Sequence, residues 1–162
     1  MRLYLVQHGA AVPEDENPER PLSPVGRDSI QKIASFLARS RFQVSGVVHS
    51  SRVRTQQTAL LLSETLGSGR LVQECIYPIG PNDPIDLIYS AIEDGPGPHI
   101  ASDRMIVGHL PFLSKLLSRL VCGDEFETVV RFRPGTVVAL ERGGNGDGWS
   151  VLWILGPELL GG

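Results

Sequence analysis

The fold is decided near the start of the chain, by the stretch LYLVQHG at residues 3–9. Leu3 to Val6 form a short, continuous apolar run that ends in a turn containing Gly9. A run of this length without polar alternation is typical of a strand buried on both faces, as strands of parallel sheets are. The stretch therefore predicts a central strand with polar residues at its carboxyl end.

The same pattern of strand, turn and helix recurs along the rest of the chain. Apolar runs predict strands, and N-cap, proline and glycine signals bound segments of helical spacing. We predict strands at 46–48, 71–76, 105–107, 136–140 and 149–155, and helices after Ser23–Pro24, over 52–66, from a cap at Asp83 to about residue 92, and after Pro111.

This alternation predicts a three-layer α/β fold, with a mostly parallel central sheet and helices on both faces. The last two strands form a hairpin that can add an antiparallel edge. No repeat, linker or low-complexity segment divides the sequence, so we expect a single domain over residues 1–162.

The composition disfavours a protein that binds nucleic acid or an anionic membrane. A net charge of −3 supplies no global basic field for nucleic acid or an anionic membrane, so any anion site must be local. The first apolar run is too short for a signal peptide or a spanning helix, and we expect a cytoplasmic protein. Cys75 and Cys122 show no disulfide or metal-type spacing, and we interpret both as core thiols.

Polar residues follow three of the predicted strands. These are Gln7-His8-Gly9, residues 50–54, and Gly108-His109. Ligands of parallel α/β sheets bind beyond the carboxyl ends of the strands, where helix N-termini also present free N–H groups. We therefore expect two histidines and the guanidinium of Arg54 to converge there.

These side chains suit chemistry at phosphorus. A neutral imidazole is a competent nucleophile, which is the role predicted for His8. Arg54 can grip two phosphate oxygens, and a protonated His109 can neutralise charge that builds on the phosphoryl group. Gly9 would let the backbone pass close to the ligand. A lone histidine at a strand end is more often structural, so the prediction depends on His8, Arg54 and His109 occurring together.

The remaining histidines are given lesser roles. His49 is expected to be buried or to support the site from behind, and His99, in a Pro/Gly loop, to be solvated. The histidines show no metal-ligand spacing, so we expect no metal and no cofactor.

At these residues the sequence resembles the histidine phosphatase superfamily, and more closely its SixA-type branch of phosphohistidine phosphatases. The resemblance spans nearly the whole chain. Its motifs are LVQHG at 5–9, RPLSPVG at 20–26, SSRVRTQQTA at 50–59 and VGHLP at 107–111. It implies a phosphoglycerate mutase-like fold, phosphoryl transfer to His8, phosphoryl binding by Arg54 and His109, hydrolysis by water, and a further phosphate contact from Arg20.

The sequence departs from the family pattern at two points. Gln7 stands where the family has an arginine, which exchanges a charged, two-pronged donor for a neutral amide. Arg52, two residues before Arg54, can compensate as a phosphate-binding residue. No clear general acid is present, and Glu74 and Asp83 are the nearest candidates by chain position.

We therefore expect a metal-independent phosphatase that forms a phosphohistidine intermediate and acts on a protein phosphohistidine, such as one on a phosphotransfer domain. A missing acid favours this substrate because imidazole leaves as a neutral ring, whereas an alkoxide needs a proton donor. Two alternatives stay open: a phosphatase for small phosphoesters, and a phosphate-binding module whose catalysis is weakened by Gln7. The sequence does not indicate the oligomeric state.

Overall fold

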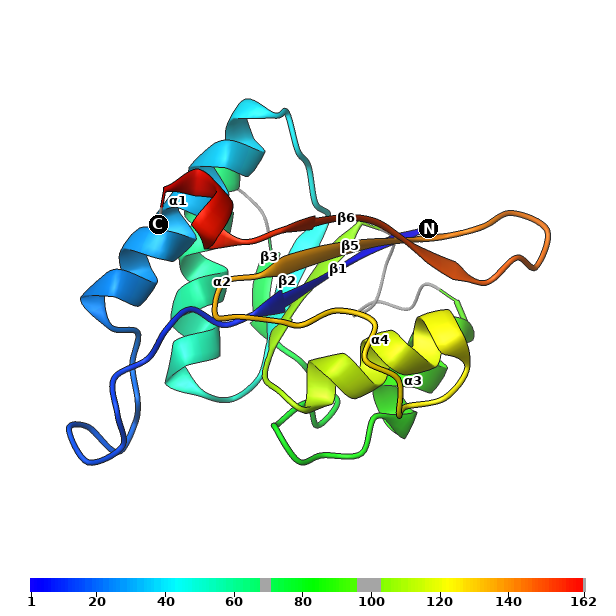
Figure 1. Cartoon of the computed structure of the whole chain (residues 1–162), viewed down its shortest axis with the longest axis horizontal. Coiled ribbons are helices and arrows are strands. Elements are labelled where there is room, and N and C mark those ends of the chain that lie inside the picture. The colour runs from blue at the N-terminus through cyan, green and yellow to red at the C-terminus, as the bar shows by residue number, and fades with distance from the viewer. Residues whose placement is uncertain (68–70, 96–102, 162) are drawn as a thin grey trace.

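The computed structural model describes residues 1–67, 71–95 and 103–161, so His99 lies outside the described residues. Its centre is a six-stranded sheet in the order β3-β2-β4-β1-β5-β6 (Figure 1). The strands are β1 (Arg2–Gln7), β2 (Gly46–His49), β3 (Leu71–Glu74), β4 (Arg104–Gly108), β5 (Val137–Arg142) and β6 (Trp149–Leu155).

The sheet is parallel from β3 to β1 and antiparallel at the hairpin. β1 lies between β4 and β5, and its apolar residues from Leu3 to Val6 are buried. The prediction of a central strand buried on both faces is therefore confirmed. The hairpin adds its antiparallel edge through β5, which pairs with β1.

Helices cover both faces of the sheet, so the prediction of three layers is confirmed (Figure 1). The core on one face packs against α1 and α2, and the core on the other packs against α3 and α4. The helices are α1 (Pro24–Arg39), α2 (Val53–Leu66), α3 (Asp86–Glu93) and α4 (Phe112–Cys122), with a short 3-10 helix η1 (Pro157–Leu160) near the C-terminus. None of the described helices is long and apolar enough to cross a bilayer.

The start of α1 follows the predicted capping pattern. Ser23 is the N-cap, Pro24 occupies the first turn, and Ser23 Oγ accepts a hydrogen bond of 3.0 Å from the Gly26 N–H group. The buried face of α1 carries Ile30, Ile33, Ala34 and Leu37, which are the residues at helical spacing in the sequence.

Two local predictions are wrong. Asp83 does not cap α3, which begins at Asp86; its carboxylate instead accepts a 2.7 Å hydrogen bond from the Gly80 N–H group and closes the preceding turn. Cys75 is buried as predicted, but Cys122 is exposed because it ends α4 on the side that faces away from the core.

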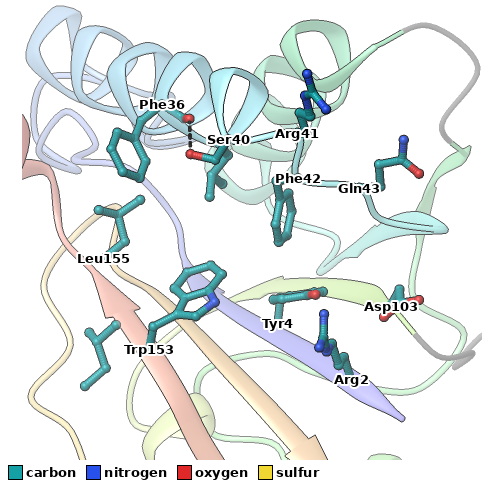
Figure 2. A pocket seen from close by; sticks show the side chains of 12 residues that line it. Arg2, Tyr4, Phe36, Ser40, Arg41, Phe42, Gln43, Asp103, Trp153 and Leu155 are labelled. Atoms are coloured by element: carbon teal, nitrogen blue, oxygen red, sulfur yellow. Dashed lines mark hydrogen bonds between the residues drawn. The ribbon is translucent and has the colours of Figure 1, made fainter.

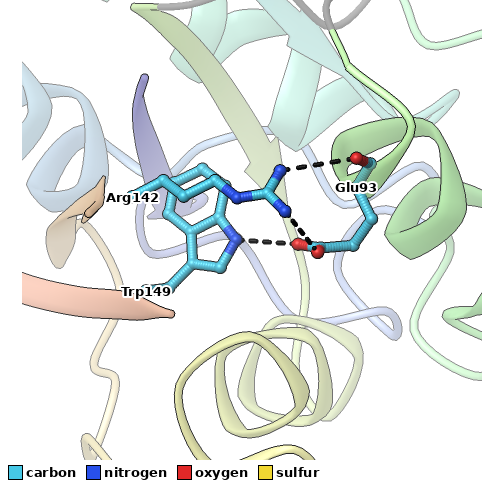
Figure 3. Close-up of polar contacts among 3 residues, drawn as sticks. All are labelled: Glu93, Arg142 and Trp149. Atoms are coloured by element: carbon cyan, nitrogen blue, oxygen red, sulfur yellow. Dashed lines mark hydrogen bonds and ion pairs between the residues drawn. The ribbon is translucent and has the colours of Figure 1, made fainter. Parts of the chain in front are cut away.

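A polar cluster ties the hairpin to α3 at the edge of the sheet where β1 begins (Figure 3). Glu93 accepts hydrogen bonds from Arg142 Nη2 at 3.0 Å and from Trp149 Nε1 at 2.8 Å. The carboxylate therefore satisfies donors from both strands of the hairpin, and holds them against the helix layer.

Candidate active site

Three strand ends meet at the opposite edge of the sheet. Gln7 lies opposite Gly108 in the β1–β4 register, and the His8 N–H group donates a 3.1 Å hydrogen bond to the Gly108 carbonyl. The imidazole rings of His8 and His109 consequently lie 5.2 Å apart between centroids. The structure thus brings together the two histidines that the sequence placed at strand ends.

His8 is held as a single tautomer. Its Nδ1 lies 2.7 Å from the Gly9 carbonyl oxygen, and because a carbonyl only accepts, Nδ1 carries the proton. Nε2 is then the free nitrogen, and Arg54 Nε donates to it at 3.3 Å. Burial lowers the pKa of His8 to about 4, assisted by the charges of Arg54 and Arg20, so the ring is neutral at pH 7.

Arginine side chains make this edge strongly cationic. Burial lowers the pKa of the Arg54 guanidinium, and the neighbouring charges of Arg20 and Arg52 lower it further. Arg20 sits at a positive φ of 49° in the loop before α1, where its Nε donates to the Val12 carbonyl at 3.2 Å. Among the described residues, none of these three arginines forms an ion pair with a carboxylate, and a cluster of unpaired positive charges is an arrangement that binds an anion.

Arg52 is placed differently from the other two arginines. It precedes α2 at the N-cap position and is exposed, and it lines a neighbouring cavity of about 370 Å³ rather than the one that contains His8. Its charge reaches Arg54 and His109, since it lowers the pKa of both.

His109 is almost completely buried, with 1% of its surface exposed. Its Nε2 lies 2.6 Å from Ser50 Oγ. Burial lowers the pKa of His109 to about 3, with further lowering by His8 and by the arginines. The ring is therefore neutral at pH 7 in this structure, and a charged His109, as expected from sequence, requires an anion beside it.

Gly9 packs against α1, where a side chain would not fit. A Cβ at Gly9 would lie 2.8 Å from Ile30 Cγ1 and 3.1 Å from the Gly26 carbonyl, both on α1. The Gly9 N–H group donates to Thr58 Oγ1 at 3.1 Å. The turn after β1 is thus clamped between α1 and α2, which fixes the backbone of His8.

Gln7 is buried, with 9% of its surface exposed, and lines the same cavity as His8. Its Oε1 has no hydrogen-bond partner among the described residues. The amide is therefore available to a ligand without first breaking a side-chain hydrogen bond of that oxygen.

The cavity has a volume of about 480 Å³. None of its described lining residues is an aspartate or glutamate. Glu74 and Asp83 line the neighbouring cavity instead. The lining consists of Gln7, His8, Ala10, Ala11, Arg20, Arg54, Pro81, His109, Leu110 and Pro134. Within the described part of the chain, no cluster of His, Cys, Asp or Glu is suited to hold a metal ion.

A larger cavity of about 680 Å³ lies between the C-terminal end of α1 and strands β1 and β6 (Figure 2). Its wall includes the packed aromatic rings of Tyr4, Phe42 and Trp153. It contains no histidine or cysteine among its described residues, so size alone does not locate the chemistry.

The sequence analysis missed three contributors to the site. Thr55 and Thr58 lie on the buried face of α2, where Thr55 bonds to Ser50 and Thr58 bonds to the turn of His8. Pro134 lines the cavity from the segment before β5. The i, i+3 spacing of the threonines beside Arg54 was the available signal. No pattern in the sequence around Pro134 predicted that it would line the cavity.

Two sequence comparisons relate this chain to known phosphatases. The profile of the histidine phosphatase superfamily (branch 1) matches residues 3–75. The chain is 25% identical to the phosphohistidine phosphatase SixA of Escherichia coli K12, over 97% of this chain and 94% of the relative.

Solved structures show the same fold. The protein histidine phosphatase SixA in complex with tungstate superposes with a TM-score of 0.81 at 20% identity, covering 99% of both chains. A putative α-ribazole-5′-P phosphatase from E. coli superposes with a TM-score of 0.70 at 19% identity, covering 96% of both. The predicted phosphoglycerate mutase-like architecture is thereby confirmed.

Proposed function

We propose that this chain, which is similar to the histidine phosphatase superfamily (branch 1) over residues 3–75, is a metal-independent phosphatase in which His8 Nε2 attacks phosphorus. The observation that carries the proposal is the tautomer of His8. With Nδ1–H donated to the Gly9 carbonyl, the lone pair of Nε2 is available in a neutral ring, beside a guanidinium that can bind the phosphoryl oxygens.

The reaction has two steps. In the first, the Nε2 lone pair of His8 forms a bond to phosphorus while the leaving atom departs with the electron pair of its own bond. Arg54 exchanges its hydrogen bond to Nε2 for one to a phosphoryl oxygen, because the nitrogen no longer has a lone pair to accept it. In the second, a water oxygen forms a bond to phosphorus while the bond between phosphorus and His8 Nε2 breaks and its electron pair returns to Nε2. The water gives up a proton to the phosphate or to solvent, and inorganic phosphate leaves neutral His8 behind.

The proposed substrate is a phosphohistidine on a protein, such as a phosphotransfer domain. The lining of the His8 cavity supports this class, because no described carboxylate there can protonate a leaving alkoxide. The imidazole of a phosphohistidine whose far nitrogen carries a proton leaves as a neutral ring and needs no such donor. The curated relative SixA is itself named a phosphohistidine phosphatase.

Gln7 motivates the second candidate, a phosphate-binding module with little turnover. An amide replaces a guanidinium at this buried position, and the loss of one charge-assisted hydrogen bond costs roughly 1.5 to 3 kcal/mol. That loss slows phosphoryl transfer by about one to two powers of ten if nothing compensates.

One experiment separates these functions. Wild type, His8→Ala and Arg27→Ala, a control on the exposed side of α1, are incubated with a protein phosphorylated on histidine and with p-nitrophenyl phosphate. We expect faster turnover of the phosphohistidine, and an acid-labile phosphoenzyme in wild type and Arg27→Ala that His8→Ala lacks. Preference for the ester would favour a small-molecule phosphatase. Phosphate binding without a phosphoenzyme would favour the binding module.

A further inference from the structure

Ser50 joins His109 to helix α2 through a chain of short contacts. Ser50 Oγ lies 2.6 Å from His109 Nε2 and 2.8 Å from Thr55 Oγ1. Thr55 Oγ1 also lies 2.7 Å from the Arg52 carbonyl and 3.0 Å from the Ser50 carbonyl. All three side chains are at least 97% buried, since their exposed fractions are 3%, 0% and 1% for Ser50, Thr55 and His109. Because water does not reach these side chains, their polar atoms depend on one another and on the nearby carbonyls for hydrogen bonds.

The number of available protons determines which group donates each of these hydrogen bonds. Carbonyl oxygens only accept, so the single hydroxyl proton of Thr55 goes to the Arg52 or Ser50 carbonyl. The Ser50 hydroxyl must then donate to Thr55 Oγ1, because otherwise two lone pairs would face each other at 2.8 Å. Ser50 Oγ is left as an acceptor, and His109 Nε2 must donate to it.

The opposite arrangement leaves contacts without a proton. If Ser50 donated to His109 Nε2, and Thr55 to a carbonyl, no proton would remain for the 2.8 Å contact between the two hydroxyls. A short oxygen–oxygen contact without a proton is repulsive, and the site is too buried for water to relieve it.

We propose that Ser50, anchored by Thr55, is a positioning residue that holds the His109 ring in one orientation and in the tautomer with its proton on Nε2. The role assigned rests on the proposed phosphatase function. Neither hydroxyl needs to touch the substrate, and both act through the imidazole of His109.

This arrangement lets His109 gain a proton without turning. Ser50 Oγ accepts from Nε2–H whether the ring is neutral or charged, and the second proton goes to Nδ1. The groups that act on His109 are His8 after β1, Arg54 and Arg52 at the start of α2, and Arg20, and all of them lower its pKa together with burial. A phosphoryl dianion would oppose these charges and raise the pKa of His109, which favours the second proton on Nδ1 when the substrate binds.

Nitrogen NMR tests the tautomer directly, with no need of a substrate. In protein labelled with ¹⁵N-histidine, long-range ¹H–¹⁵N spectra at pH 7 distinguish a protonated from an unprotonated ring nitrogen, and the signals missing from His109→Gln assign the residue. We expect a protonated Nε2 in wild type. A protonated Nδ1 would overturn the proposal, whether or not the protein proves to be a phosphatase.

Matched variants test the role. Thr55→Val removes the hydroxyl and keeps the shape, whereas Thr55→Ser keeps the hydroxyl; exposed Ser51→Ala is the neighbouring control. We expect Ser50→Ala and Thr55→Val to lower kcat by roughly 5- to 30-fold with KM changed less than about twofold, and to mix the His109 tautomers.

The conservative variants give the opposite expectation. Ser50→Thr and Thr55→Ser should keep the wild-type tautomer and most of kcat. Unchanged kcat and spectra in Ser50→Ala and Thr55→Val would overturn the proposal. If Ser50→Ala does not fold, the pair Thr55→Val and Thr55→Ser decides the same question. An inactive wild type with intact spectra would contradict the phosphatase function and leave the tautomer result standing.

Discussion

The Arg54 Nε–H group donates a 3.3 Å hydrogen bond to His8 Nε2, the ring nitrogen that carries no proton. The guanidinium therefore lies against the lone pair that attacks phosphorus in the proposed reaction. A phosphoryl group that approaches Nε2 must displace this hydrogen bond. The guanidinium of Arg54 is then free to donate to a phosphoryl oxygen.

We expect Arg54→Ala to lower kcat/KM by roughly 10- to 100-fold, since a charge-assisted hydrogen bond to the phosphoryl group is lost. Arg52→Ala should cost less than about threefold, because Arg52 is exposed and lines the neighbouring cavity. Steady-state kinetics with a phosphohistidine protein measures both. Equal losses would place Arg52 in the phosphoryl pocket and make it the substitute for the arginine missing at Gln7.

Gln7→Arg should raise kcat/KM by roughly one to two powers of ten, because it restores a charged donor at the cavity wall. Gln7→Met, of similar size and without the amide, is the matched control and should fall below wild type. Inhibition by orthovanadate gives an independent measure of anion binding. Lower activity in Gln7→Arg would mean that the pocket is built around glutamine, with Arg20 and Arg54 repelling the new cation.

The free energy of unfolding should fall as the pH is lowered below 6.5. The folded-state pKa values of His8 and His109 are about 4 and about 3, so between pH 6.5 and these values the unfolded chain binds protons that the folded protein does not. For His109 this difference amounts to about 2 kcal/mol at pH 5. Urea denaturation at pH 7 and pH 5 measures it, and His109→Gln should show the smaller fall. An equal fall in the variant would contradict the lowered pKa of His109.

Gly26→Ala should destabilise the protein by about 1 to 3 kcal/mol, because a Cβ there would overlap the Ala10 carbonyl oxygen. The obstacle is backbone and cannot rotate away. Gly144→Ala, where no atom lies within 4 Å, is the control and should be close to neutral. Thermal denaturation compares the two, and similar melting temperatures would argue against tight packing between α1 and the turn after β1.

The cluster in Figure 3 should stabilise the fold without affecting catalysis. Glu93→Gln weakens bonds to Arg142 and Trp149 at the edge remote from His8, and we expect a loss of about 1 to 3 kcal/mol. Glu141→Gln, which removes an exposed ion pair with Arg2, should cost less than about 0.5 kcal/mol. Urea denaturation measures both losses, with kcat/KM unchanged. Equal losses would show that the Glu93 cluster adds no more than a surface pair.

Local patterns in the sequence were sufficient for the elements and for the edge of the sheet that carries the site. Buried strands such as β1 have no polar alternation, and Ser23 with Pro24 is a strong helix start, so both predictions are confirmed. His8, Arg54 and His109 come together because parallel strands end at one edge. Their convergence needed only the order of strands and helices.

Other features depended on contacts that no local pattern encodes. Asp83 has the residue type of a helix cap, but its carboxylate bonds within the preceding turn. Cys122 belongs to an apolar helix, yet its exposure depends on which side of α4 meets the sheet. Arg52 and Arg54 are two residues apart and face different cavities, a separation set by where α2 begins.

The first two turns of α2 carry Arg54, Thr55, which bonds to Ser50 beside His109, and Thr58, which accepts from the Gly9 N–H group in the turn of His8. One helix end therefore supports two groups that the ends of β1 and β4 carry: it contacts His8 through Arg54, and it reaches His109 through Thr55 and Ser50. Fraying of this helix end would remove all of these contacts together. The stability of this helix end can differ from the stability of the whole fold. Amide hydrogen exchange at residues 54–58 measures it, whereas global thermal denaturation does not.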